Sequence, residues 1–86
     1  MKVALPTPLA EYTGHRSEVE AEGATLAELF EDLDRRHPGL RFRVVDERGA
    51  IRPHIKVFVD GIQAPGLRVP LAPSARVRVV AALSGG

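Results

Sequence analysis

The sequence predicts an α+β domain in which a mixed sheet of four to five strands packs on one main helix. Two patterns indicate this class: an amphipathic helical stretch near the middle of the chain, and short alternating apolar and polar stretches on both sides of it. At 86 residues the chain has room for one core, because a domain of this length buries only about 60–65% of its unfolded surface. A single amphipathic helix has one apolar stripe to bury, which covers one face of a small sheet.

The first two alternating stretches predict an antiparallel hairpin. Residues 2–5 alternate, with Val3 and Leu5 on one face, and prolines close the strand. Residues 17–22 alternate carboxylates with small apolar groups; the expected core residues are Val19 and Ala21, and the expected water-facing residues are Glu18, Glu20 and Glu22. We expect a loose loop containing Gly14 between the two strands.

The predicted helix begins at a capping box. Thr25 takes the N-cap position, and Glu28 reaches back from the third helical position. Four apolar residues then recur at the spacing of one helix face: Leu26, Leu29, Phe30 and Leu33. Residues 35–37 place basic groups in the last turn, where they suit the helix dipole, and Pro38-Gly39 ends the helix.

The second half of the chain predicts two further strands. Residues 40–45 fit either a strand or a helical turn, and residues 46–49 form a turn. Residues 55–59 are strongly β-prone and end in Asp60-Gly61, a dipeptide typical of tight hairpins. Proline and glycine keep the following residues irregular, and residues 76–80 form the last strand.

This order of elements is that of the β-grasp fold. A hairpin, a helix across the sheet and a return through further strands is the arrangement found in ubiquitin. The sequence therefore predicts one β-grasp domain over residues 1–82 and a flexible tail over residues 83–86.

Composition excludes several classes of function. The 12 basic and 11 acidic residues give a net charge of +1, which argues against direct nucleic-acid binding. The chain has no cysteine, so it offers no disulfide, thiolate metal site or cysteine nucleophile. Its three histidines lie in unrelated contexts, and we expect no catalytic residues and no metal site. The apolar run over residues 79–83 is too short to span a membrane, and the N-terminus is no signal peptide, so we expect a soluble cytoplasmic protein.

The tail carries the most specific signal. At a glycine usage of about 7%, a chain ends in Gly-Gly by chance roughly once in two hundred. Gly85 and Gly86 have no Cβ atom, so they form a slender end that can enter a narrow slot, and a partner enzyme could activate the unhindered carboxylate. The alternative is a frayed, functionless end.

The chain resembles the MoaD and ThiS sulfur-carrier family over essentially its whole length. Leu83-Ser84-Gly85-Gly86 after a valine-rich strand is similar to the ending of that family, and residues 23–26, 37–40 and 57–61 are similar to other parts of it. Residues 46–49 and 52–54 resemble members that donate sulfur for purposes other than molybdopterin. The chain departs from the family where it has Ser74-Ala75 in place of Gly-Asp and Ala81-Ala82 in place of the Pro-Pro of many molybdopterin-type members.

The resemblance implies a carrier that is a co-substrate and not an enzyme. An adenylating enzyme related to the ubiquitin activators would consume ATP and convert the Gly86 carboxylate to an acyl adenylate. A sulfur donor such as a persulfide would displace AMP and leave a thiocarboxylate, and a second enzyme would accept the sulfur. The carrier itself would bind no cofactor. The resemblance does not specify the final sulfur acceptor, and the alternatives are a molybdopterin precursor, thiazole, cysteine, a tRNA base and a secondary metabolite.

Strand phase predicts a docking surface on the outer face of the sheet. In the strands predicted over residues 55–59 and 76–80, every second residue is expected to face the helix. The residues between them then project outward and form an apolar centre with a basic rim. The residues of this surface are Lys56, Phe58, Arg76, Arg78 and Val80. In the alternative, residues 62–73 cover Phe58 and the arginines only aid solubility.

Other functions stay open beside the sulfur carrier. A covalent modifier would end with Gly86 linked to a target lysine, so lysine-linked conjugates in cells would favour it and free thiocarboxylate would favour the carrier. A plain interaction module would be insensitive to deletion of Gly86. A small nucleic-acid binder would show salt-dependent binding.

Overall fold

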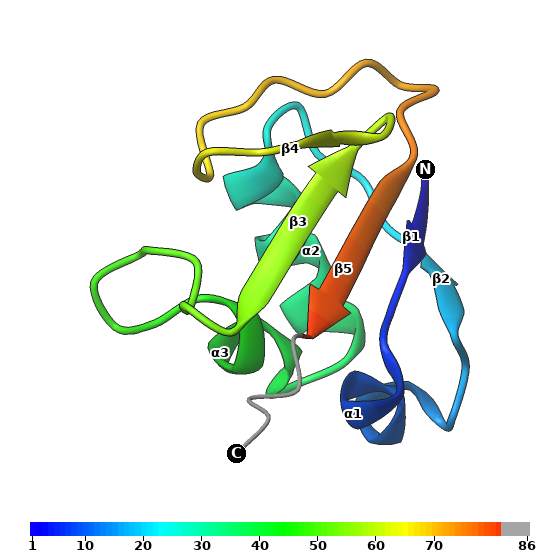
Figure 1. Ribbon diagram of the computed structural model, residues 1–86. Helices are drawn as coiled ribbons and strands as arrows, with labels where there is room; N and C mark the ends of the chain where they lie inside the picture. Colours follow the sequence, from blue (N-terminus) through cyan, green and yellow to red (C-terminus); the bar gives the residue numbers. More distant parts are fainter. Residues whose placement is uncertain (82–86) are drawn as a thin grey trace.

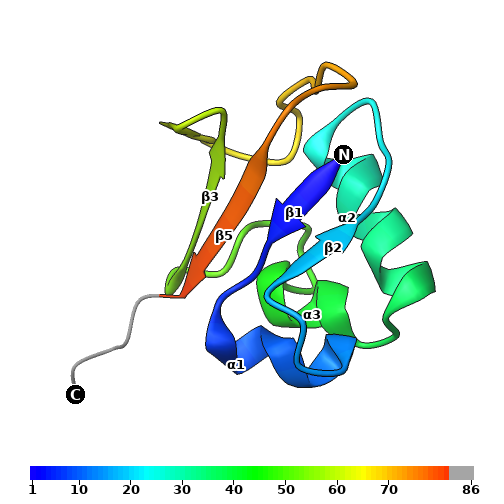
Figure 2. The ribbon, with the colours of Figure 1, turned by 90° about the vertical axis from the view of Figure 1, so that its right-hand side faces the viewer.

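The computed structural model describes residues 1–81, which form a five-stranded mixed sheet with helices on one face (Figures 1 and 2). The strand order is β2-β1-β5-β3-β4, with β1 and β5 parallel and the other neighbours antiparallel. The strands are β1 (Lys2–Ala4), β2 (Glu18–Glu20), β3 (Ile55–Val59), β4 (Ile62–Gln63) and β5 (Val77–Ala81). The helices are α1 (Thr7–Ala10), the 3-10 helix η1 (Glu11–Thr13), α2 (Leu26–Arg36) and α3 (Leu40–Val44). The predicted α+β class with one main helix is confirmed.

Helix α2 forms where the capping box predicts it. The Thr25 hydroxyl accepts a hydrogen bond from the Glu28 backbone N–H at 3.3 Å. The Glu28 carboxylate accepts from the N–H of Ala24 at 3.0 Å, one residue earlier than the predicted reciprocal bond to the N-cap. The helix ends at Arg36 with His37 as its C-cap, and Gly39, at φ 95° in the left-handed region, is the N-cap of α3.

The core lies between α2 and the inner face of the sheet. The whole predicted apolar stripe of α2 is inaccessible to solvent. The predicted strand phases also hold, since Val19 and Ala21 are buried while the three glutamates around them are exposed. The fully buried larger side chains are Phe30, Leu26, Leu29, Leu33, Leu40, Val3, Val44, Val45 and Val57.

The connection between β1 and β2 is helical, so the predicted loose loop is wrong. Pro6 lies at the N-cap of α1 in an extended conformation, and a second proline in the first helical turn favours the helix because its φ is already fixed. Leu9 buries its side chain under the sheet, and Gly14, at φ 68°, ends η1. An apolar anchor inside a proline-rich connection therefore folds it into helical turns.

The ambiguous residues 40–45 form helix α3. Leu40 and Val44 are fully buried while Phe42 between them is exposed. A strand would place all three side chains on one face, whereas a helical turn places Phe42 on the side opposite Leu40 and Val44. The predicted turn follows, in which the Asp46 carboxylate accepts backbone N–H bonds from Arg48 and Ala50.

The tight turn after β3 forms as predicted, but the two-residue strand β4 follows it where irregular chain was expected. Asp60 and Gly61 have φ of 49° and 85°, the positive values of a type I′ turn. Residues 64–72 contain no helix or strand, but they run along the start of α2 and bond to it. The Leu26 and Ala27 N–H groups donate to residues 69 and 67, and the Leu71 N–H donates to residue 24.

Two predictions on chain organisation concern residues that the structure does not describe. Strand β5 reaches Ala81, and the predicted boundary after residue 82 and the tail over residues 83–86 lie outside them. Within residues 1–81, no helix is long and apolar enough to cross a membrane.

Asp32 is a buried carboxylate that ties the loop after β2 to α2. Its Oδ2 accepts from the Glu22 backbone N–H at 2.8 Å, and its two oxygens accept from Arg35 and Arg36. The Glu22 N–H, opposed by burial and helped by the two guanidinium groups, holds the pKa of Asp32 below its usual value. Because both arginines are largely exposed, the backbone bond is the main contribution.

Asp32→Asn is expected to lower the free energy of unfolding by about 1–2 kcal/mol near neutral pH, because the amide is a weaker acceptor than the carboxylate. A depressed folded-state pKa gives stability that is complete above the unfolded-state pKa and is lost as the pH falls through the folded-state value. Denaturant titrations should therefore show that the difference in free energy of unfolding between the wild type and Asp32→Asn disappears as the pH is lowered. Glu31→Gln, at an exposed position of α2, is the control. A difference independent of pH would contradict the assignment.

Candidate functional site

The candidate site is the outer face of the sheet together with the described end of β5. Strand β5 lies between β1 and β3, and its last residue, Ala81, pairs with Ile55 at one end of the sheet. The predicted sulfur-carrying residue Gly86 and the tail residues Leu83, Ser84 and Gly85 lie outside the described residues. Their roles remain predictions.

The structure brings the five residues of the predicted docking surface together. Cross-strand pairing sets Lys56 opposite Val80 and Phe58 opposite Arg78. Arg76 precedes β5 and is tied to the β3–β4 turn, because its N–H donates to the Asp60 carboxylate at 3.0 Å. Alternation along β3 and β5 buries Val57, Val77 and Val79 and leaves the predicted surface residues on the opposite face. We call Lys56, Phe58, Arg76, Arg78 and Val80 the outer-face patch.

The apolar centre of the outer-face patch is open. Phe58 is half-buried, Val80 is 37% exposed, and both line a shallow depression of about 810 Å³ with Arg76 and Arg78. The alternative, in which residues 62–73 cover Phe58, does not hold. Gln63 pairs with Phe58 at the side, and residues 67–71 bond to the start of α2, on the helix side of the sheet.

The sequence reasoning missed Lys2 as a member of this face. The parallel pairing of β1 with β5 sets Ala4 opposite Arg78, so the outward side chains of β1 extend the depression, which Lys2 also lines. Its ammonium lies 3.8 Å from the Glu18 carboxylate. No local signal reveals this neighbourhood, because the two strands are more than 70 residues apart in the chain.

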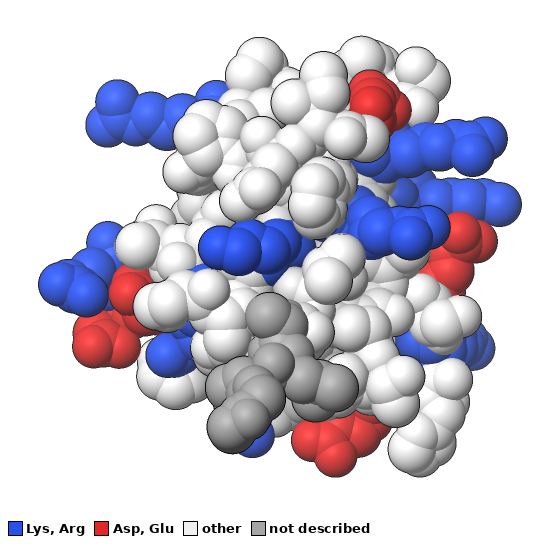
Figure 3. Space-filling model, viewed as in Figure 1, with Lys and Arg blue, Asp and Glu red and all other residues white. Residues whose placement is uncertain are grey.

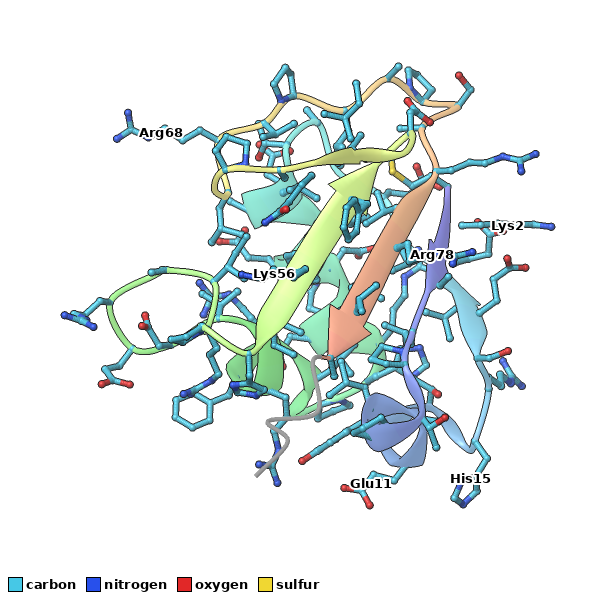
Figure 4. The ribbon with its side chains drawn as sticks, viewed as in Figure 1. Lys2, Glu11, His15, Lys56, Arg68 and Arg78 are labelled. Atoms are coloured by element: carbon cyan, nitrogen blue, oxygen red, sulfur yellow. The ribbon has the colours of Figure 1, made fainter. Side chains whose placement is uncertain are left out.

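The outer face is positively charged. Figure 3 shows basic side chains across the middle of this face, and Figure 4 shows Lys56 and Arg78 over β3 and β5, with Lys2 beside them. Among residues 1–81, no carboxylate lies within 4 Å of the charged side-chain nitrogens of Lys56, Arg76 or Arg78. Cations without partners around an apolar centre suit an interface with an acidic rim.

The described residues hold no candidate metal site. No group of three or more histidine and carboxylate side chains in residues 1–81 is arranged to hold a metal ion.

Comparison with known proteins identifies the family. The family model described as the ThiS family matches residues 3–86. The chain belongs to the ThiS family. The sulfur carrier protein CysO of Mycobacterium tuberculosis is 28% identical over 89 residues, which cover 98% of this chain and 96% of the relative. The predicted resemblance is confirmed.

Solved structures confirm the β-grasp fold of this ThiS-family chain. A chain in the crystal structure of the Amycolatopsis orientalis BexX/CysO complex has a TM-score of 0.91 at 32% identity, covering 99% of this chain and 98% of that one. Mycobacterium tuberculosis CysO gives 0.90 at 26% identity over 95% and 98%. Small archaeal modifier protein 1 of Haloferax volcanii gives 0.77 at 29% identity over 96% and 97%.

Proposed function

We propose that this ThiS-family chain carries sulfur as a thiocarboxylate on Gly86. The observation that carries the proposal is the family match, which runs through the last residue of a sequence ending in Gly85-Gly86. Relatives that cover nearly the whole chain are named sulfur carrier proteins. The chain is then a substrate of its partner enzymes.

The chemistry proceeds in two steps on the terminal carboxylate. A carboxylate oxygen of Gly86 attacks the α-phosphate of ATP in an adenylating enzyme, pyrophosphate leaves, and an acyl adenylate forms. A persulfide sulfur then attacks the acyl carbon and expels AMP, which gives an acyl disulfide. A thiol of the partner cleaves that disulfide, so a new disulfide forms on the partner and the thiocarboxylate is released. The absence of cysteine from the chain suits this route, because no carrier thiol competes for the persulfide.

The outer-face patch is the proposed docking surface for the adenylating enzyme and then for the enzyme that accepts the sulfur. Val80 lies next to Ala81, so a partner bound to the patch is already close to the residue from which the chain continues to Gly86. Phe58 and Val80 supply the apolar centre, and Lys56, Arg76 and Arg78 supply the rim.

Intact-mass measurement tests the proposal. Incubation with the adenylating enzyme, ATP and a sulfur donor is expected to add the mass difference between one sulfur and one oxygen. A variant that lacks Gly86 should not gain it, although its folded core is unchanged. An unmodified mass for the full chain in every condition, including protein purified from its host, would refute the proposal.

A second candidate function is covalent modification of other proteins. It is favoured by the likeness to a protein named small archaeal modifier protein 1 over 96% of this chain. In that case a lysine amine attacks the activated Gly86 carbonyl and an isopeptide bond forms. Lysine-linked conjugates that disappear with the Gly86 deletion would support this function.

A further inference from the structure

A second exposed cluster lies at the end of the sheet, apart from the outer-face patch. It consists of Tyr12 on η1, Phe42 and Arg43 on α3, and Arg52 in the loop before β3, and we call it the arginine–aromatic surface. Phe42 is 59% exposed, an unusual position for a large aromatic side chain in a small domain. Leu40 and Val44 bury the other side of α3, so Phe42 and Arg43 lie on its solvent side.

Each arginine of this surface is held against an aromatic ring. The guanidinium carbon of Arg52 lies 4.5 Å from the centroid of the Phe42 ring, and its Nε donates to the Phe42 carbonyl at 2.7 Å. The guanidinium carbon of Arg43 lies 5.7 Å from the Tyr12 ring, and its Nε donates to the Tyr12 hydroxyl. Both contacts use Nε, so the outer nitrogens of each fork stay available for a carboxylate.

Neither arginine has an acidic partner within the described chain. Among residues 1–81, no carboxylate lies within 4 Å of Arg43 or Arg52, whereas Arg35 and Arg36 of α2 are both paired with Asp32. Residues 40–54 contain four arginines and two carboxylates, an excess of positive charge larger than that of the whole chain. The charge is therefore concentrated at this end of the molecule and is already fixed in position.

The arginine–aromatic surface lies beside Ala81, the last described residue of β5. The Ile55 N–H donates to the Arg52 carbonyl at 2.9 Å, and Ile55 pairs with Ala81, the last residue of β5. Figure 1 shows α3 at the same end of the sheet as the end of β5. An enzyme that encloses the residues beyond Ala81 must approach this surface.

We propose that the arginine–aromatic surface docks an acidic rim on the adenylating enzyme, around the entrance to the site that takes Gly86. The inference rests on the proposed function. Tyrosine and arginine are the residue types that most often dominate protein interfaces, and side chains already held in place lose little entropy on binding. A protein partner is favoured over nucleic acid because the chain as a whole is nearly neutral.

Kinetics with the adenylating enzyme form the first test. The double variant Arg43→Glu/Arg52→Glu is expected to raise KM for the carrier at least about tenfold, because two attractive contacts become repulsive, and the effect should shrink as salt is added. Arg68→Glu is the charge-matched control, since Arg68 is exposed at the opposite end of the molecule (Figure 4). A KM equal to that of the control would overturn the proposal. The double variant Arg43→Gln/Arg52→Gln should show a smaller rise in the same direction.

A titration of the full chain, followed by the NMR signals of its backbone amides, forms the second test and does not depend on thiocarboxylate formation. An aspartate-rich peptide is expected to shift the amides of residues 12, 42, 43 and 52 saturably in the wild type and not in the double variant. Tighter binding of a single-stranded RNA oligonucleotide at these residues would overturn the proposal in favour of a nucleic-acid partner. If the wild type forms no thiocarboxylate, the proposed function fails. The docking of an acidic protein partner is then judged from the peptide titration: saturable shifts at these residues support it, and their absence contradicts it.

Discussion

Phe58→Asp is expected to reduce the rate of thiocarboxylate formation at low carrier concentration by about 100-fold. A central aromatic side chain of an interface typically contributes 2–4 kcal/mol to binding, and about 1.4 kcal/mol corresponds to a tenfold change. Phe58 lines the depression beside Val80, and a carboxylate there would also pair with Arg78 across the strands and withdraw its charge from the partner. The measurement is the initial rate of thiocarboxylate or AMP formation with the adenylating enzyme.

Folding must be separated from docking in this experiment. Since Phe58 is only half-buried, the variant is expected to lose about 1–2 kcal/mol of stability and to remain folded. Gln63→Asp is the matched control, because Gln63 pairs with Phe58 on the edge strand β4 and is exposed. Unchanged thiocarboxylate formation in a folded Phe58→Asp protein would remove the outer-face patch from the docking surface.

Gly23→Ala is expected to lower the free energy of unfolding by at least about 3 kcal/mol. A Cβ atom at residue 23 would lie 2.5 Å from the Leu29 backbone nitrogen and 2.8 Å from its Cα. These atoms belong to the backbone of α2, so no side chain can rotate away, and the loop and the helix must separate. The segment from β2 to α2 would lose the packing that also holds the Asp32 bond to Glu22.

Denaturant unfolding of Gly23→Ala beside Gly66→Ala measures this effect. A Cβ atom at residue 66 meets no atom within 4 Å, so that variant should match or slightly exceed the wild type in stability. Equal stability of the two variants would show that the loop before α2 moves at little cost, contrary to the close contact in the structure.

Local patterns were sufficient for the elements whose residues specify them directly. The capping box and the apolar stripe located α2, and Asp60-Gly61 located the β3–β4 turn. Each of these signals depends only on residues close to it in the sequence. The alternation of β3 and β5 also predicted which side chains form the outer-face patch. Strand phase follows from the two-residue repeat, whatever the strands pair with.

Tertiary contacts decided the remaining features. Residues 40–45 alternate like a strand, but the structure buries Leu40 and Val44 and leaves Phe42 exposed, a pattern that a helical turn fits and a strand does not. The connection after β1 became helical because Leu9 is buried beneath the sheet. In both cases the local preference is weak, and the free energy gained by burying one or two apolar side chains exceeds it.

The sequence by itself determined the fold class, the face of each main strand and the Gly-Gly ending that indicates the ThiS family. Only the tertiary structure decided which distant segments meet. The parallel pairing of β1 with β5 adds Lys2 to the outer face, and the packing of α3 against η1 and the following loop brings Arg43 and Arg52 onto aromatic rings. The physical reason is that residue periodicity acts over one turn of helix or one step of strand, whereas strand order and helix packing depend on the burial of the whole core.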